Sequence, residues 1–209
     1  MAPGPAPVSI LITGFGRFPG APDNPSASLA RALARSRRFP GAHLTADVLP
    51  TLWRTAEDFP ARLERERPDI VLMIGLAARR PHLCVERLGR NGGGVFPDAG
   101  RRRPARRVLA PGGPAGIAST AEPVALLHAL RGARVPARLS RDAGRYICNA
   151  LAYRAYGWAR AQGRLAIFIH VPLPRPGLSL TQMRRALEAL LRALIAQHRA
   201  RALMAAARR

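Results

Sequence analysis

The sequence predicts an α/β fold in which a mostly parallel sheet lies between layers of helices. Short apolar runs at 8–14, 69–75 and 165–169 have the length and composition of buried strands. Segments with helical spacing separate these runs, and this alternation is typical of parallel strands joined by crossover helices. The 209 residues contain neither an internal repeat nor a linker, so we expect a single-domain, three-layer αβα sandwich over 1–209.

The first part of the chain is expected to contain three strands and two helices. In order, these are strands at 8–14, 43–49 and 69–75 and helices at 26–38 and 54–67. We expect Ser26 to be the N-cap of the first helix, since its hydroxyl can accept a bond from a free amide of the first turn. Pro60 should kink or split the second helix. The run 69–75 is apolar throughout, as a strand covered on both faces requires.

The rest of the chain alternates in the same way around one long loop. In order, we expect an extended piece at 84–88, a loop or flap at 92–118, a helix near 122–130, a helix containing Cys148, a strand at 165–169 and a long helix from about 180. The loop is rich in Gly, Pro and Arg, and loops of this length are usually functional or disordered. The last helix carries an apolar stripe that indicates core or oligomer contact.

The charge is the unusual part of the composition. There are 34 basic residues, all of them arginine, against 12 acidic ones, which gives a net charge of +22. Arginines along one face would bind phosphates, so an acidic partner such as nucleic acid is one interpretation. The other is a soluble protein with scattered surface arginines. No aromatic residue interleaves with the arginines at 101–103 and 106–107, as a base-stacking platform requires, so nucleic acid is the weaker alternative.

The compartment is indicated by what the sequence lacks. Cys84 and Cys148 do not make the disulfide framework of a secreted chain. Residues 1–5 do not begin a basic and then apolar signal peptide, and no apolar run is long enough to span a bilayer. We therefore expect a cytoplasmic protein with no membrane partner.

A cysteine and a histidine stand where a nucleophile and a base are expected. Cys148 lies in the first turn of its helix, where the positive end of the helix dipole favours the thiolate. His170 directly follows the strand at 165–169. If helix and strand are neighbours, the two side chains meet and the chain is a candidate cysteine hydrolase. The structural alternatives are a buried thiol, our interpretation of Cys84, and a hydrogen-bonded histidine at a strand end.

Five motifs, which follow one another along nearly the whole chain, also point to a protein family. They are Thr13-Gly14-Phe15-Gly16-Arg17-Phe18-Pro19-Gly20 with Asn24-Pro25-Ser26, Leu49-Pro50-Thr51-Leu52-Trp53, Gly75-Leu76-Ala77 with Glu86-Arg87 and Asn91, Ala143-Gly144-Arg145-Tyr146-Ile147-Cys148-Asn149, and Ile169-His170-Val171-Pro172. Together they resemble the pyroglutamyl-peptidase I family, also called pyrrolidone-carboxylate peptidases.

The resemblance implies a Cys-His-Glu triad that removes an N-terminal 5-oxoproline from peptides without metal or cofactor. By matching position, Cys148 is the nucleophile, His170 the base and Glu86 the group that orients the base. Glu86 has a structural alternative, a salt bridge to Arg87 or another neighbour. The resemblance also suggests a homo-oligomer, a dimer or tetramer, which +22 per subunit would oppose unless the interfaces are apolar.

The substrate's first residue is a neutral lactam, so its pocket should be apolar with a few hydrogen bonds. By the resemblance, Phe15 and Phe18 sandwich the ring. The other expected pocket residues are Asn24, Thr51, Phe96, Tyr146 and Ile147. The two phenylalanines have plain core packing as their alternative.

Four departures from the family pattern bear on specificity. Leu76 replaces a glutamine, Ala78-Arg79 a glycine pair, Val95 an arginine and Arg145 a threonine. With no arginine at 95, an oxyanion or loop role would pass to Arg80 or Arg90. Arg145 would lower the pKa of Cys148 if it points inward, or else narrow the pocket. We expect the catalytic machinery to be kept, while substrate preference is free to drift.

Overall fold

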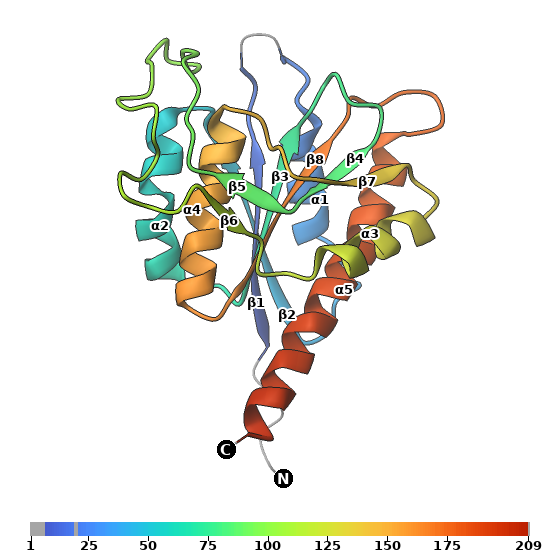
Figure 1. The fold of residues 1–209 in the computed structure, drawn as a ribbon. Helices are drawn as coiled ribbons and strands as arrows, with labels where there is room; N and C mark the ends of the chain where they lie inside the picture. Colours follow the sequence, from blue (N-terminus) through green and yellow to red (C-terminus); the bar gives the residue numbers. More distant parts are fainter. Residues whose placement is uncertain (1–6, 19–20, 209) are drawn as a thin grey trace.

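A six-stranded sheet forms the centre of the computed structural model, which describes residues 7–18 and 21–208. Its order is β2-β1-β3-β8-β4-β7 (Figure 1). The strands are β1 (Val8–Phe15), β2 (Ala42–Leu49), β3 (Ile70–Leu76), β4 (Leu83–Glu86), β7 (Ala137–Ser140) and β8 (Leu165–Val171). All neighbours are parallel except β4 and β8. The mostly parallel α/β fold predicted from the sequence is therefore confirmed. Residues 1–5, Pro19 and Gly20 lie outside the described residues.

Five helices cover the two faces of this sheet. They are α1 (Pro25–Ala34), α2 (Trp53–Glu66), α3 (Pro123–Gly132), α4 (Ile147–Ala161) and α5 (Leu180–Ala206). Figure 1 shows α2 and α4 on one side and α1, α3 and α5 on the other. Each side has its own buried apolar cluster, because the alternate side chains of the central strands point to opposite faces. The result is a three-layer sandwich with two cores.

The N-terminus of α1 differs from the sequence prediction. Asn24 is the N-cap, and its Oδ1 accepts a hydrogen bond from the Ser26 amide at 3.1 Å. Ser26 lies inside the helix, where its hydroxyl accepts a bond from the Phe15 amide at 2.9 Å. The prediction of Ser26 as the cap was wrong, because Pro25 takes the first helical position, where its missing N–H costs nothing.

Pro60 does not split α2, which runs as one helix over Trp53–Glu66. Ala56, Phe59 and Leu63 are buried in the cluster shared with α4. This packing holds the turns on both sides of the proline in place and outweighs the loss of one backbone hydrogen bond.

Two regions contain strands that the sequence patterns did not indicate. The piece predicted at 84–88 divides into β4 and β5 (Leu88–Arg90), and β5 pairs with β6 (Gly116–Ala118) in a separate two-stranded ribbon. The predicted loop at 92–118 therefore ends in a strand. At the edge of the main sheet, β7 was missed because it is short, half polar and preceded by Pro136.

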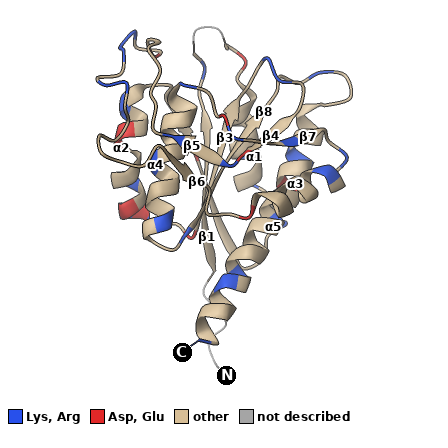
Figure 2. Cartoon of the chain, viewed as in Figure 1, with Lys and Arg blue, Asp and Glu red and all other residues tan. Residues whose placement is uncertain are grey.

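The arginines are spread over helices of both layers and over the loops, rather than gathered in one stripe, in the view of Figure 2. Within residues 7–18 and 21–208, none of the helices combines the length and apolar character that a membrane crossing requires.

Candidate active site

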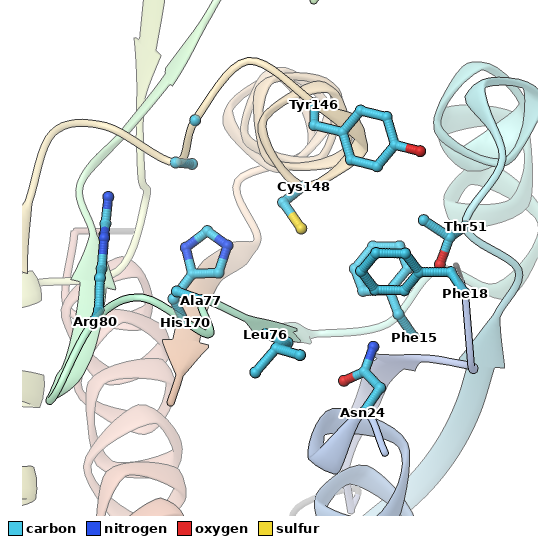
Figure 3. A pocket seen from close by; sticks show the side chains of 12 residues that line it. Phe15, Phe18, Asn24, Thr51, Leu76, Ala77, Arg80, Tyr146, Cys148 and His170 are labelled. Carbon is cyan, nitrogen blue, oxygen red and sulfur yellow. The ribbon is translucent and has the colours of Figure 1, made fainter. Parts of the chain in front are cut away.

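A cavity of about 230 Å³ opens at the carboxyl ends of β1, β3 and β8, beside the start of α4. Parallel sheets commonly place their ligand sites at this edge. The lining residues are Phe15, Phe18, Asn24, Thr51, Leu76, Ala77, Arg80, Ala143, Gly144, Tyr146, Cys148 and His170. In Figure 3, Phe15, Phe18, Thr51 and Tyr146 lie on one side of Cys148, and His170 and Arg80 lie on the other. The cavity thus has an aromatic half and a charged half.

Cys148 is placed by the first turn of α4 above the end of β3. A Cβ atom built on Gly75 would lie 3.1 Å from the Cys148 sulfur. Gly75 is also the register partner of His170 on the neighbouring strand β8. Because register partners in a sheet point to the same face, the sulfur lies over the strand position next to the imidazole. The predicted nucleophile and base therefore share one corner of the cavity.

Gly75→Ala should damage both packing and activity. The added methyl group would lie 2.6 Å from the Phe168 ring and 3.1 Å from the Cys148 sulfur, so one of them must move. We expect unfolding free energy to fall by about 1–3 kcal/mol and kcat to fall by about 10- to 100-fold as the sulfur is displaced. Urea unfolding and steady-state kinetics measure the two effects. Gly132→Ala, where the added methyl meets nothing within 4 Å, is the control and should lower neither stability nor kcat.

The electrostatic environment of Cys148 differs from the prediction. Burial raises the pKa of its thiol to about 12, and the negative charge of Glu86 adds to this effect. Arg145 is exposed to solvent and does not point inward to stabilise a thiolate. The expectation of a lowered pKa was wrong, because the packed surroundings disfavour the charged sulfur more than the helix start favours it. The free thiol is therefore neutral near pH 7.

His170 is held by a buried carboxylate. Its Nδ1 lies 2.8 Å from Glu86 Oε1, and the side chains of His170 and Glu86 are 6% and 0% exposed. An Nδ1–H that donates to a carboxylate leaves Nε2 free to accept a proton. The imidazole also packs against Phe168, with ring centroids 4.8 Å apart. Glu86 and Phe168 therefore fix the orientation of the imidazole.

Tyr156 is a structural link that the sequence analysis missed. Its buried hydroxyl donates to the Glu86 carbonyl at 2.7 Å and accepts from the Phe168 amide at 3.0 Å. Tyr156 lies on α4, and its partners lie on β4 and β8. It therefore connects the helix that carries Cys148 to the strands that carry Glu86 and His170. An aromatic residue at helical spacing gives no sign of such a role in the sequence.

Glu86 has an ionic partner, but not the neighbouring Arg87. Arg80 Nη1 lies 2.8 Å from Glu86 Oε1, the same oxygen that meets His170. The other oxygen, Oε2, is buried and has no hydrogen-bond partner among the described residues. The salt bridge to Arg80 and the contact with His170 therefore occur at one carboxylate.

Of the seven residues predicted to line the lactam pocket, the structure brings five together. Phe15, Phe18, Asn24, Thr51 and Tyr146 line the cavity. Phe15 also belongs to a buried apolar cluster, as its core-packing alternative requires. Asn24 commits its Oδ1 to the cap of α1, while its Nδ2 donates to the Gly16 carbonyl at 3.2 Å. Thr51 Oγ1 is buried without a partner among the described residues.

The other two predicted pocket residues lie elsewhere. Phe96 is 65% exposed, and its carbonyl accepts a bond from the Trp53 indole at 3.1 Å. Ile147 is fully buried in the core beneath α4, because the first turn of the helix directs it inward. The neighbour of Phe96, Pro97, is contacted by Tyr146, whose hydroxyl donates to the Pro97 carbonyl at 3.0 Å.

The departures from the family pattern can also be placed. Leu76 lines the cavity, so an apolar side chain stands where the family has an amide. Arg80 lines it too, whereas Arg90 turns away and donates from Nε to the Arg141 carbonyl at 3.2 Å. Val95 is 42% exposed. Of the two arginines considered for the missing role, only Arg80 reaches the site.

The start of α4 has no side-chain cap from its N-cap residue. Tyr146, the N-cap, makes no side-chain hydrogen bond to the helix, whereas Asn24, Glu122 and Ser179 cap α1, α3 and α5. The first amides of a helix have no partner within it and are suited to a negative oxygen. Among residues 7–18 and 21–208, no group of three or more His, Cys, Asp or Glu could hold a metal ion.

Comparison with known proteins gives one consistent family. The family model described as pyroglutamyl peptidase matches residues 8–200. The pyrrolidone-carboxylate peptidase of Thermococcus kodakarensis is 34% identical over 193 residues, covering 87% of this chain and 93% of that protein. That of Deinococcus radiodurans is 34% identical over 210 residues, covering 90% and 95%.

Solved structures agree in fold. The pyrrolidone carboxyl peptidase from Thermococcus litoralis superposes with a TM-score of 0.82 at 26% identity, covering 90% of this chain and 93% of that one. A mutant pyrrolidone carboxyl peptidase from Pyrococcus furiosus superposes with a TM-score of 0.84 at 24% identity, covering 91% and 100%.

Proposed function

The chain belongs to the pyroglutamyl peptidase family, and from this premise we propose that it removes N-terminal pyroglutamate from peptides through Cys148, His170 and Glu86. It is a cysteine hydrolase of the pyroglutamyl-peptidase I type. The observation that carries the residue roles is the shared cavity of Cys148 and His170, with Glu86 on Nδ1 of the imidazole at 2.8 Å.

In the proposed reaction the neutral thiol loses its proton as it attacks. His170 Nε2 accepts the proton while the sulfur bonds to the carbonyl carbon that links pyroglutamate to the next residue. The resulting oxyanion is stabilised by the free amides at the start of α4. Collapse breaks the C–N bond, and the imidazolium protonates the leaving amine. Water, deprotonated by His170, then hydrolyses the thioester and restores the thiol.

The aromatic half of the cavity supports recognition of a neutral ring. Phe15, Phe18 and Tyr146 supply apolar surface, and Thr51 supplies a buried hydroxyl with no hydrogen-bond partner in the described part of the chain. A buried hydroxyl without a partner is costly unless a ligand completes its hydrogen bonding. We assign Thr51 Oγ1 to the lactam amide of the substrate.

Hydrolysis of a fluorogenic pyroglutamyl amide by the purified protein tests the proposal. The matched substrate is the corresponding prolyl amide, which has the same ring size but a charged amine and no lactam carbonyl. We expect turnover of the first and little of the second. Equal turnover of both would contradict a lactam-specific site.

Thr51→Val should weaken substrate use while leaving the fold intact or more stable. The change removes the hydroxyl and keeps the shape of the side chain. We expect kcat/KM for the pyroglutamyl amide to fall by about 3- to 10-fold, as for the loss of one neutral hydrogen bond. Thermal unfolding should show equal or higher stability, because an unpartnered buried hydroxyl is removed.

Thr13→Val is the control for this experiment. Thr13 Oγ1 is also buried without a partner among the described residues, but Thr13 does not line the cavity. It should gain stability and keep its kcat/KM. A matching loss of activity in both variants would contradict a specific role for Thr51.

Compartment and assembly complete the proposal. Cys84 and Cys148 are both free thiols, which supports the cytoplasm as the compartment.

Leu203 and Met204 near the end of α5 are 72% and 64% exposed, which supports a homo-oligomer in which a second subunit covers apolar surface. Light scattering of the purified protein measures the assembly state.

A further inference from the structure

Arg80 joins the two sides of the site through its guanidinium group. Nη1 donates to Glu86 Oε1 at 2.8 Å and to Ser140 Oγ at 3.3 Å, and Nη2 donates to the Asp142 carbonyl at 2.7 Å. Glu86 holds the imidazole, whereas 140–142 leads into Ala143 and Gly144, which form the cavity wall before Cys148. Arg80 therefore contacts both the carboxylate that holds His170 and the segment that leads to Cys148.

Arg80 and His170 contact the same oxygen of Glu86, so Arg80 can affect how the imidazole is held. Glu86 Oε1 accepts from both Arg80 Nη1 and His170 Nδ1, each at 2.8 Å, while Oε2 has no partner among the described residues. A carboxylate buried at 0% exposure needs compensation to remain charged. Arg80 supplies a permanent positive charge at that atom. Its donors also fix the plane of the carboxylate, and so the direction from which His170 is held.

Other groups around Glu86 cannot take this role. The titratable or charged groups that face Glu86 or act on it are Arg80, Cys84, Cys148, Tyr156 and His170, with Arg138 acting in turn on Cys84. Cys84 and Cys148 are thiols whose pKa values are raised by burial. Tyr156 uses its hydroxyl on the Glu86 backbone carbonyl. Arg80 is the cation in direct contact with the carboxylate.

We propose that Arg80 is a positioning residue for the reaction: it holds the Glu86 carboxylate in a fixed orientation, and it thereby keeps His170 ready to accept the proton of Cys148. This rests on the proposed function. Arg80 acts through Glu86 rather than on the substrate, so its removal should affect kcat far more than KM.

The test compares Arg80→Ala, Arg80→Lys and wild type with the pyroglutamyl amide over a range of pH. We expect kcat to fall by about 10- to 100-fold in Arg80→Ala, as for a displaced catalytic group, with KM little changed. The acid limb of kcat/KM should move to higher pH, because a fixed positive charge next to the Glu86–His170 pair is removed. Arg80→Lys keeps the charge but not the forked contacts, so it should recover the acid limb and only part of kcat.

Arg184→Ala is the matched control. Arg184 is another partly exposed arginine paired with a buried carboxylate, Glu188, at 3.1 Å, but on the opposite helical layer. The Arg184→Ala variant should be less stable than the wild type, while its kcat and the acid limb of its pH profile stay unchanged. The lysine variant keeps the test informative if Arg80→Ala does not fold.

Two results would overturn the inference. One is an increase in KM with kcat unchanged, which would make Arg80 a substrate contact. The other is reduced thermal stability with wild-type kcat and an unmoved acid limb, which would make it structural. In both cases the wild type still hydrolyses the substrate, so the proposed function survives. If the wild type has no activity, both proposals fall together.

Discussion

Replacing Cys148 by alanine should remove hydrolysis of the pyroglutamyl amide, with kcat lower by at least about ten-thousand-fold. In the proposed reaction the sulfur forms the covalent bond to the substrate, and nothing else in the described cavity can replace it. Only binding and the free amides at the start of α4 would remain. Steady-state kinetics on both proteins give the ratio.

Cys84→Ala is the control for this substitution. Cys84 is also a free thiol, but it is 1% exposed, lies in β4 and does not line the cavity. We expect this variant to keep its activity. Turnover that survives in Cys148→Ala would contradict the nucleophile. Absence of turnover in the wild type, together with salt-sensitive binding of nucleic acid, would favour the alternative of a basic binding protein.

The raised pKa of the Cys148 thiol shapes the pH dependence. A thiol whose pKa is about 12 is protonated through the neutral range, so the wild type should show no extra thiolate absorbance over Cys148→Ala near neutral pH. Because His170 accepts the thiol proton during the attack, activity should not depend on prior ionisation of the thiol. A preformed thiolate near neutral pH would contradict this order of events.

Glu86→Gln should be the second most damaging change, with kcat lower by about 10²- to 10⁴-fold. The amide keeps the shape of the side chain but removes the charge that Arg80 and His170 both contact at 2.8 Å. It also permits the wrong tautomer of His170. Stability should fall by about 1–3 kcal/mol, since Glu86 is buried while Arg80 is partly open to solvent.

Glu188→Gln separates this effect from general loss of stability. Glu188 is 3% exposed and is paired with Arg38 and Arg184 on the other helical layer. It should lose stability by a similar amount while its kinetics stay those of the wild type. If Glu86→Gln also kept its kcat, the orienting role of Glu86 would be wrong.

The fold could be predicted from the sequence because its strongest signals are local. β1, β3 and β8 are continuous apolar runs buried on both faces, and such runs have few other stable arrangements. The strand β7 carries Arg138 and Ser140 at a sheet edge, where polar residues and strand pairing are compatible, so its pattern is weak. The antiparallel direction of β4 depends on pairing across the sheet, which no local pattern records.

The candidate site was predictable in its residue types but not in its electrostatics. Cys148 and His170 could be selected because a helix start and a strand end fix where they lie. The pKa of Cys148 depends on how tightly the surrounding chain packs, and the helix start and Arg145 both suggested the wrong direction. Arg80 was considered for an oxyanion or loop role, and its contact with Glu86 comes from a turn that only the folded chain brings close.

The hydroxyl of Tyr156, which gives one hydrogen bond and receives another inside the molecule, links a helix to two strands of the sheet. Sliding of α4 against the sheet would break both bonds at once. The two bonds therefore oppose such sliding and help to keep Cys148 in place over the strands that carry Glu86 and His170.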